Sequence, residues 1–594
     1  MMQMEDNFHI SIKHSKSSVD TATVDINGKE YYIHSLYDPI AEAKRWVSNI
    51  ELKEGSIFVV FGLGLGYHII ELCKLLDNSS KVIVIEPSKE LIDIFIKKNG
   101  LNDLISNGQL IICNASLKTE IYNVLSNSIT YDAIDRVYLY VFGQYGNLFK
   151  ESYNVFLEAF KECINAKRID INTSLFFAER WQKNVILNLP YVIDSVPFKG
   201  LINMFKNRPG IIISAGPSLN KNIELLKEAK NKAVLMAVGT SVKALLKHNI
   251  IPDFVVAIDG SVGNYKHFKN IEVDCPLVYD LYLYPEIVEE YKGPKIISVS
   301  SCPYTPWIAK ELDEDFGFIN AGPTVANMAF DFARQLGCNP IIFVGQDLAY
   351  TDNKTHADGT TYEGQRIENP ESENYIYVDD IYGNKVLSSK AFLSFKTWFE
   401  DQIYQHPDRT YIDATEGGAY IKGTKIMTLR DVINKYCYST IDVKKALNEY
   451  FSTFNGYRKE NIQKLVSDLK DIEKQIEKLE PLCERGEKLS KRLLDVYKKN
   501  IGYDAGKLLK DLDKIDKEIK EYKDGLGFLS IMLHVVAFKV TKGFEPQDNE
   551  TEKEKGIRVS NMSFALYNGM LTAMQEIKPY LARCIENIQS KYLK

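Results

Sequence analysis

The residues with the clearest chemical potential in this chain form a short loop. The apolar run 210–213 leads directly into Ser214-Ala215-Gly216-Pro217-Ser218, and a helical pattern follows. A strand that turns sharply into a helix leaves backbone N–H groups without partners at the positive end of the helix dipole. Such a turn can bind a phosphate group, or it can be only a rigid turn in which Ser218 caps the helix. The residues that would contact a ligand are Ser214, Gly216, Pro217 and Ser218.

Four further apolar runs end in small polar residues in the same way. The carboxyl ends of the strands of an open parallel sheet form one rim, and ligands bind at that rim. We therefore expect the five strand ends to gather at one polar site, because five such ends in succession are hard to explain as turns alone. The residues at the four further ends are Gly239, Thr240, Ser241, Asp259, Gly260, Asn320, Gly322, Pro323, Thr324, Gln346, Asp347 and Tyr350.

This predicted rim is rich in hydroxyl, amide and backbone donors but has few bases. The titratable candidates are Asp259, Asp347 and His356. His356 lies in a polar stretch, where a histidine could remove a proton from an acceptor hydroxyl or could simply be an exposed loop residue. The chain has no HxH or HExxH motif and no Walker lysine after the loop, which disfavours metallohydrolases and P-loop kinases. We expect no metal site, and the pattern fits a transferase that holds a nucleotide phosphate as leaving group.

A second glycine loop stands near the start of the chain. Gly62, Gly64 and Gly66 follow an apolar run, and Glu86 ends the next one. This spacing is typical of a nucleoside-binding Rossmann loop or of the first motif of methyltransferases that use S-adenosylmethionine. The bulky Tyr67 leaves little room for a ligand, so we favour a scaffold or acceptor-binding role over a cofactor site.

Composition excludes several classes of protein. The 594 residues are 45% hydrophobic and 26% charged with a net charge of −6, an ordinary globular composition that gives no electrostatic case for nucleic acid. The nine cysteines form no CxxC pair, which favours reduced thiols in a cytoplasmic protein. No signal peptide is apparent, and the most apolar segment, 525–538, is too short to span a membrane and is predicted to be a buried helix.

Strands and helices alternate in two parts of the chain, and helices alone follow. The fold class we predict is α/β, with Rossmann-like parallel-sheet domains at 1–195 and 196–430 and an all-helical domain at 431–594. The polar stretch 351–380 is expected to be a lid or binding loop. Two apolar stripes with helical spacing, 462–479 and 508–522, are expected to be separated by a break at Pro481 and Gly486. The strands expected in the second domain are 210–214, 233–238, 254–258, 295–299, 316–320 and 340–345.

Several motifs occur together in a family-specific order. These are the run 214–260, Gly345-Gln346-Asp347-Leu348-Ala349-Tyr350, Thr355-His356-Ala357-Asp358-Gly359, and the stretch 414–423. In this order they resemble the bacterial motility accessory factors (Maf proteins), and the resemblance extends over nearly the whole chain. That family is understood as flagellin glycosyltransferases, which move pseudaminic or legionaminic acid, two nonulosonic acids, from a CMP-activated form to Ser or Thr hydroxyls. Its central domain is similar to bacterial CMP-sialic-acid transferases, which work without a metal.

The resemblance implies roles for the residues of the rim. Gly216, Pro217 and Ser218 would contact the CMP phosphate, the other polar strand ends would line the nucleotide-sugar, and His356 would be the base in a direct inversion at the anomeric carbon. The implied partners are flagellin and a CMP-activated nonulosonic acid, with no further cofactor, and the oligomeric state stays open. One residue departs from the pattern: the sialyltransferases carry asparagine where this chain has Ala215.

Two other interpretations remain. The loops 216–219 and 251–260 also resemble archaeal-type 6-hydroxymethylpterin diphosphokinases, which use ATP and Mg²⁺. Those enzymes end the relevant strand in Asp-x-Asp-Gly, whereas here it ends in Asp259-Gly260, and a single carboxylate is a poor magnesium site. The third interpretation is a flagellin chaperone or export adaptor without catalytic activity, in which the C-terminal helices bind flagellin.

Overall fold

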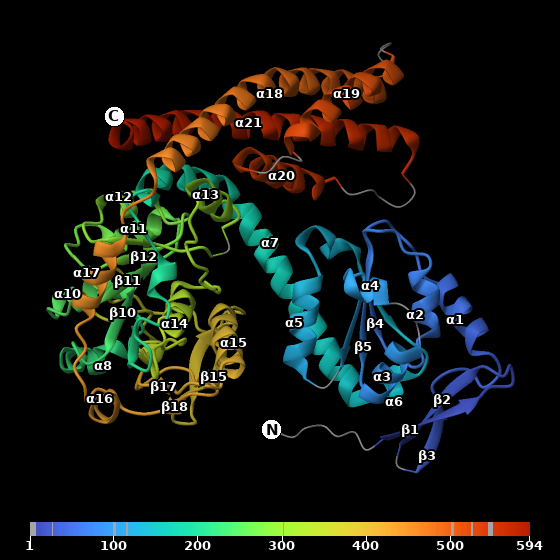
Figure 1. The fold of residues 1–594 in the computed structure, drawn as a ribbon, viewed down its shortest axis with the longest axis horizontal. Coiled ribbons are helices and arrows are strands. Elements are labelled where there is room, and N and C mark those ends of the chain that lie inside the picture. Colours follow the sequence, from blue (N-terminus) through green and yellow to red (C-terminus); the bar gives the residue numbers. More distant parts are fainter. Residues whose placement is uncertain are drawn as a thin grey trace. The chain divides into compact units, whose positions relative to one another are not determined.

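The computed structural model describes residues 8–26, 28–98, 102–114, 117–300, 302–499, 504–523, 527–544 and 550–594. The chain forms two compact units, Met1–Phe176 and Phe177–Lys594 (Figure 1). The boundary between the units falls inside helix α7 (Lys150–Val192). The division into three domains, with the helical region separate from the second sheet, stays a prediction.

The first unit contains a small antiparallel sheet and a parallel sheet. The antiparallel sheet has the order β1-β2-β3 and the parallel one the order β6-β5-β4-β7. Strand β4 is apolar along its whole length, and β5 is apolar between Lys81 and Glu86; these apolar residues are buried on both faces, as expected for a parallel sheet covered by helices. The elements are β1 (Phe8–His14), β2 (Asp20–Ile26), β3 (Lys29–Tyr32), α1 (Pro39–Ser48), β4 (Ile57–Phe61), α2 (Tyr67–Cys73), β5 (Lys81–Glu86), α3 (Lys89–Lys98), α4 (Asn102–Ser106), β6 (Leu110–Asn114), α5 (Lys118–Ser128), β7 (Val137–Val141) and α6 (Tyr145–Leu148).

The second unit is built on a nine-stranded sheet in its described residues, and every strand pairs in parallel with its neighbours. The order is β18-β17-β14-β9-β10-β11-β12-β13-β8. The chain runs outward from β9 to β13 and then returns to β14 on the other side of β9, so the strand order reverses between β9 and β14. In open α/β sheets the ligand crevice lies at this switch point, outside the carboxyl ends of the strands. The strands are β8 (Val196–Pro197), β9 (Gly210–Ile213), β10 (Val234–Val238), β11 (Phe254–Ala257), β12 (Leu277–Tyr279), β13 (Lys295–Ile297), β14 (Ile341–Val344), β17 (Tyr411–Asp413) and β18 (Lys425–Ile426).

Helices cover both faces of this sheet. Ile211 and Ile213 of β9 face one apolar core and Ile212 faces the other, which is the period of two that a doubly covered strand requires. Helix α14 packs on β9, β10 and β11 at the centre of the second face. The helices are α8 (Leu219–Asn222), α9 (Leu226–Ala229), α10 (Val242–Lys247), α11 (Val262–Phe268), α12 (Pro285–Glu290), α13 (Thr305–Leu312), α14 (Val325–Gln335), α15 (Lys390–Gln405), α16 (Leu429–Tyr436) and α17 (Val443–Thr453).

Two expectations about this unit are corrected. The run 316–320 is not a strand and makes one isolated bridge, Val299 to Phe318, because Gly317 has a φ of 77° and interrupts the extended backbone. The stretch 351–380 is not a loop throughout, since it ends in β15 (Tyr375–Asp379), which pairs with β16 (Lys385–Ser389) as an antiparallel hairpin.

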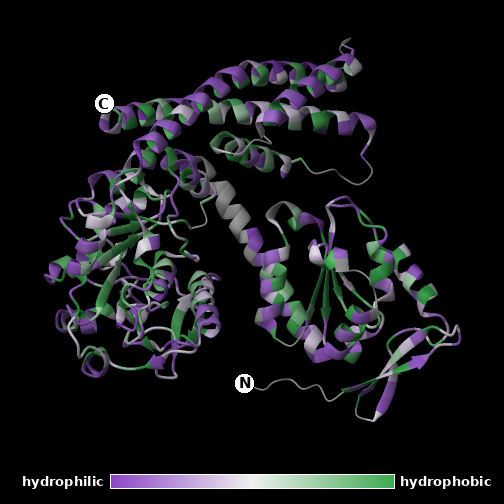
Figure 2. Ribbon diagram, viewed as in Figure 1, coloured by the Kyte–Doolittle hydropathy of each residue, from purple (hydrophilic) through white to green (hydrophobic). Residues whose placement is uncertain are grey.

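The C-terminal region is helical in its described residues. It consists of α18 (Lys459–Lys499), α19 (Ala505–Lys523), α20 (Phe528–Thr541) and α21 (Glu552–Tyr592), and α18 and α21 lie side by side (Figure 1). The predicted break at Pro481 and Gly486 is wrong, because α18 continues through both residues. A Cβ on Gly486 would lie 2.7 Å from the ring of Tyr567 on α21, so this glycine allows two helices to approach closely. The apolar stripes face other helices, and the outer faces are polar (Figure 2).

The predicted fold class is confirmed: two parallel α/β sheets are followed by helices. Helix α20 covers the described part of the segment predicted as a buried helix, and its Leu529, Met532 and Leu533 are buried. No helix in the described parts of the chain has the length and apolar character needed to cross a membrane.

Candidate functional site

The loop 214–218 lies at the switch point of the nine-stranded sheet. The Gly216 N–H donates to the Gly345 carbonyl at 2.8 Å, and the Ser214 hydroxyl donates to Gln346 Oε1 at 2.5 Å. The ends of β9 and β14 are thus joined side by side, as the sequence predicts for polar strand ends. A Cβ on residue 216 would lie 2.1 Å from Asp347 Oδ1, so only glycine fits at this position.

Hydrogen bonds to the carboxylate of Asp347 hold the loop 214–218 in place. Its carboxylate accepts hydrogen bonds from the Ser218 N–H at 3.1 Å, the Ser218 hydroxyl at 2.5 Å and the Thr351 hydroxyl at 2.5 Å. Only 2% of Asp347 is exposed, and this burial raises the pKa of its carboxyl group. The expectation that the turn offers free N–H groups is therefore wrong for Gly216 and Ser218, since the protein itself uses both. Asp347 positions the loop, and its buried carboxylate does not face solvent.

The turn 322–324, also on the rim, has features that suit the binding of an anion. Gly322 and Pro323 are exposed, and Thr324 caps the eleven-residue helix α14 by accepting the Asn327 N–H at 3.3 Å. The Thr324 hydroxyl donates to Asn327 Oδ1 at 2.7 Å, and Asn327 Nδ2 is buried with no hydrogen-bond partner in the described structure. Exposed backbone at the start of a long helix, above a buried amide donor, is suited to a phosphate group. The neighbouring Asn320 contributes its N–H to Asp331 of the same helix at 2.8 Å.

The residues that follow His356 are hydrogen-bonded to the loop 214–218 and to helix α8. The Ala357 N–H donates to the Ala215 carbonyl at 2.9 Å, and the Asp358 N–H donates to Asn220 Oδ1 at 2.9 Å. These bonds bring the histidine to the carboxyl end of β9. Its ring is partly buried, which lowers the pKa of the imidazole, and Nδ1 has no hydrogen-bond partner among the described residues. An imidazole that stays neutral near pH 7 can accept a proton.

Asp259 is exposed at the end of β11. Its carboxylate accepts the Ser261 N–H at 2.9 Å and the Ser261 hydroxyl at 3.1 Å. Both Asp259 and His356 interact electrostatically with His267 of α11, a buried residue that the sequence analysis did not identify. His267 stands at the end of the helix that follows β11, and only the folding of three distant segments onto one rim brings it near His356.

The other predicted residues mostly shape the strand ends. The Ser241 hydroxyl oxygen lies 2.8 Å from both the Ile213 and the Val238 carbonyl oxygens, which share its single hydrogen, and this contact ties β9 to β10. A Cβ on Gly239 would lie 2.8 Å from the Phe268 ring, which explains the glycine there. Thr240 between them is half-buried on the rim.

Gly260 and Tyr350 occupy the two sides of the rim. A Cβ on Gly260 would lie 2.4 Å from the Tyr282 carbonyl, and Asn184 Nδ2 of α7 bridges the Gly260 and Tyr282 carbonyls at 3.0 and 2.9 Å. The centroid of the Tyr350 ring lies 5.1 Å from that of Phe392 on α15 and 5.4 Å from that of Tyr375 on β15, so Tyr350 packs against the β15–β16 hairpin. Across the described ranges, no group of three His, Cys, Asp or Glu side chains could hold a metal ion.

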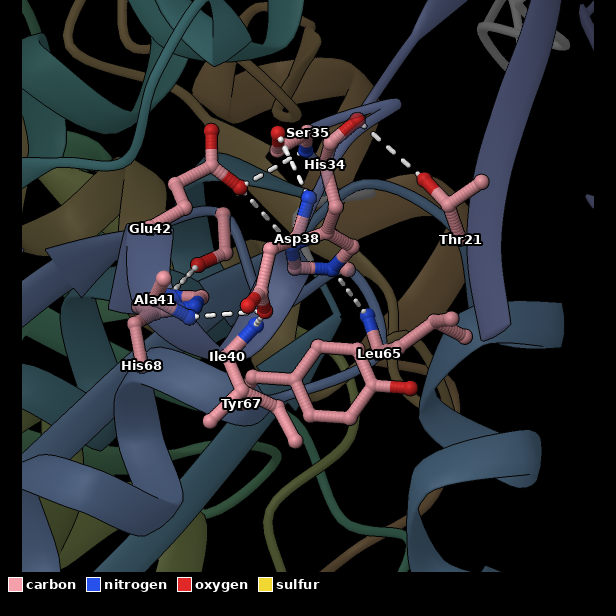
Figure 3. Close-up of polar contacts among 12 residues, drawn as sticks. Thr21, His34, Ser35, Asp38, Ile40, Ala41, Glu42, Leu65, Tyr67 and His68 are labelled. Atoms are coloured by element: carbon pink, nitrogen blue, oxygen red, sulfur yellow. Dashed lines mark hydrogen bonds and ion pairs between the residues drawn. The ribbon is translucent and has the colours of Figure 1, made fainter. Parts of the chain in front are cut away.

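The glycine loop of the first unit has no free donors at three successive positions. The Leu63 N–H donates to Glu86 Oε2 at 2.7 Å, and the Gly64 N–H lies 2.7 Å from the Tyr145 hydroxyl and 3.2 Å from Glu86 Oε2. The Leu65 N–H donates to His34 Nε2 at 2.8 Å (Figure 3). The Glu86 carboxylate thus takes the place that a ligand oxygen has in a nucleoside-binding loop, and its burial raises the pKa of Glu86 to about 7. A Cβ on Gly64 would lie 2.4 Å from the same His34 nitrogen. These contacts favour the scaffold interpretation of this loop.

The fold and its rim define the class of protein. It is a doubly wound α/β protein whose polar strand ends gather at the switch point, and the same chain carries a second Rossmann-like unit and a helical region. Over 98% of its length this chain aligns with the solved structure of a Maf glycosyltransferase from Magnetospirillum magneticum AMB-1, 94% of which is covered, with a TM-score of 0.58 and 16% identity. The resemblance to the motility accessory factors is thereby confirmed at the level of the fold.

Sequence comparisons match parts of the chain. The model of a family described as 6-hydroxymethylpterin diphosphokinase MptE-like matches residues 183–353. A 6-hydroxymethyl-7,8-dihydropterin pyrophosphokinase from Methanocaldococcus jannaschii is 32% identical over 82 residues, which are 13% of this chain and 34% of that enzyme. Two uncharacterized proteins from Treponema pallidum are 31% identical over 98 residues (16% of this chain, 46% of the relative) and 20% identical over 338 residues (55% and 58%). The chain thus spans less than two thirds of the length of each of these curated relatives.

Proposed function

We propose that this protein is a glycosyltransferase that moves a nonulosonic acid from its CMP-activated form to a protein hydroxyl. The observation that carries the proposal is the position of His356, a partly buried imidazole tied by the Ala357–Ala215 bond to the switch-point loop. The likeness in fold to a Maf glycosyltransferase along nearly the whole chain supports the same class of reaction.

In this proposal the phosphate of the donor lies at the start of α14. The exposed Gly322–Pro323 turn and the unpartnered Asn327 amide supply donors there, while the Ser214 loop supplies a rigid wall and not its own N–H groups. The remaining polar strand ends, among them Thr240 and Gln346, line the nucleotide-sugar. No residue of the first unit is needed for donor binding.

His356 acts as the general base. The acceptor hydroxyl attacks the anomeric carbon, its proton passes to the His356 imidazole, and the bond from the anomeric carbon to the CMP phosphate oxygen breaks with both electrons going to CMP. The configuration at the anomeric carbon inverts. The charge on the leaving phosphate is stabilised by the positive end of the α14 dipole, so we propose that the reaction needs no metal.

The acceptor we propose is flagellin, as the family resemblance implies, and the site of the reaction is the cytoplasm. The nine cysteines are free, and such thiols persist in a reducing compartment. A chaperone without catalytic activity would need no polar rim, and the apolar stripes of the C-terminal helices are already buried against one another. We therefore assign those helices to packing more than to capture of flagellin.

A second candidate is pyrophosphate transfer to a pterin, because the matching family model and the relative from Methanocaldococcus concern such enzymes. That reaction uses ATP with Mg²⁺. Asp259 is exposed just after the carboxyl end of β11, whereas Asp253 lies before the start of that strand and is buried in an ion pair with Lys230. The family model of these kinases matches residues 183–353, so a pterin kinase activity would give the first unit and the C-terminal helices no role. We favour the glycosyltransferase.

Ligand-induced stabilisation separates the two candidates. A ligand at about one hundred times its Kd adds about 2.7 kcal/mol to the free energy of unfolding. We expect CMP to raise the melting temperature measured by calorimetry, cytidine to have a smaller effect because it lacks the phosphate, and ATP with Mg²⁺ to have none. Stabilisation by ATP with Mg²⁺ and not by CMP would favour the pterin kinase.

A further inference from the structure

His267 is a buried histidine beside the candidate base. It lies near the end of α11, whose start is capped by Ser261, and only 4% of it is exposed. Its Nδ1 is 3.1 Å from the hydroxyl oxygen of Thr361. Its ring meets the Tyr362 ring edge to face, with centroids 5.1 Å apart and planes at 75°. Two consecutive residues of the segment that carries His356 are thus held by one side chain.

The Tyr362 ring also contacts the ring of His356. The centroids of these two rings are 4.9 Å apart, with an interplanar angle of 44°. Closer to His356, the segment is held by the Ala357 and Asp358 N–H groups. His267 holds Thr361 and Tyr362, so residues 356–362 form a short strap that begins at His356 and is held near its start by Ala357 and Asp358 and at its end by His267.

One tautomer of His267 satisfies both contacts of the Thr361 hydroxyl. In that tautomer His267 Nδ1–H donates to the Thr361 hydroxyl oxygen at 3.1 Å, and the single hydroxyl hydrogen of Thr361 donates to the Lys266 carbonyl at 3.4 Å. Burial, with His356 and Lys243 nearby, lowers the pKa of His267 to about 4, although Asp259 acts in the opposite direction and Lys266 in the same one. His267 is therefore neutral above that pH, and its bond to Thr361 persists over the range in which a histidine base works.

We propose that His267 is a positioning residue for His356: through Thr361 and Tyr362 it holds the strap so that the base imidazole meets the acceptor hydroxyl in one orientation. The contacts of His267 with Thr361 and Tyr362, which we call the clamp, are observed in the structure. Its effect on catalysis rests on the proposed function, in which His356 removes the proton.

Two substitutions separate the hydrogen bond from the packing. His267→Phe keeps a ring against Tyr362 but cannot donate to Thr361, whereas His267→Asn places an amide N–H near the position of Nδ1. We expect His267→Phe to lower the kcat of sugar transfer by about 10- to 100-fold with an unchanged Kd for CMP, because a misplaced base costs up to about 100-fold. His267→Asn should recover most of the rate. His248→Phe, at a partly exposed histidine paired with Glu224, is the matched control and should have no effect.

A double-mutant cycle with Thr361→Val tests whether His267 affects kcat through its hydrogen bond to Thr361. If the His267–Thr361 bond carries it, Thr361→Val alone should resemble His267→Phe, and adding it to His267→Phe should change kcat little. Fully additive losses would overturn the proposal.

Histidine titration by NMR supplies a readout that does not need activity. His356 should titrate below the ordinary histidine pKa in the wild type, and in His267→Phe its pKa should rise because the loosened strap admits water. An unchanged His356 titration together with unchanged kcat would overturn the proposal. A shifted titration in a protein that transfers no sugar would uphold the clamp and refute the glycosyltransferase assignment.

Discussion

Replacing His356 by alanine is expected to lower the rate of sugar transfer by about 10²- to 10⁴-fold, the range that general-base catalysis contributes. The affinity for CMP should stay within about twofold, because the imidazole acts on the acceptor hydroxyl and not on the nucleotide. The strap that carries His356 is held by backbone bonds of Ala357 and Asp358, which the substitution leaves in place. The fold and the donor site should therefore survive.

Single-turnover transfer with saturating CMP-sugar is the measurement for this prediction, with His248→Ala as control. The wild-type rate should show an acid limb. Burial lowers the pKa of His356, so the neutral base is present above this lowered pKa and is lost as the pH falls through it. The limb should lie below the ordinary histidine value and vanish in His356→Ala. If His356→Ala transfers sugar at the wild-type rate, His356 is not the general base, and Asp259, the exposed carboxylate near His267, becomes the next candidate.

Replacing Asp347 by alanine is expected to destabilise the protein by about 3–5 kcal/mol, because each buried donor left without an acceptor costs about 1–3 kcal/mol. Three donors, the Ser218 N–H and the hydroxyls of Ser218 and Thr351, would lose their common acceptor. The loop 214–218 would then lose its fixed shape, and we expect the affinity for CMP to fall by at least about tenfold, or 1.4 kcal/mol.

Urea unfolding and calorimetric titration with CMP measure these two effects separately. Asp379→Ala is the matched control, because this carboxylate is exposed on β15 and paired with Lys385. Its loss should change the free energy of unfolding by less than about 1 kcal/mol. If Asp347→Ala binds CMP normally and is as stable as the control but inactive, Asp347 acts on the substrate and our positioning role for it is wrong.

The strand ends of the rim could be predicted because each combines a short apolar run with small polar residues. Ser214, Gly216 and Gln346 all lie where the pattern indicates, at adjoining ends of β9 and β14. The order of the strands was not predictable from the pattern, since pairing depends on contacts between distant segments. The meeting of Ser218 with Asp347, 129 residues later, is such a contact.

The misses have equally specific causes. His267 was not identified because it stands in an ordinary helix, and only the return of Thr361 to α11 gives it a role. Gly486 predicts a helix break by its residue type, whereas in the structure it makes room for the Tyr567 ring in a helix that continues. In the first unit the glycine spacing matched a nucleoside site, but Glu86 itself fills the position of a ligand.

The central claim, that this protein transfers a nonulosonic acid from CMP to flagellin, is tested most directly by the intact mass of flagellin co-produced with it and with a pathway that supplies the CMP-nonulosonate. The account predicts a mass increase of one sugar residue for each modified hydroxyl with the wild-type protein, and unmodified flagellin with His356→Ala produced at the same level. Flagellin of unchanged mass in the presence of the wild-type protein and the CMP-sugar would contradict it.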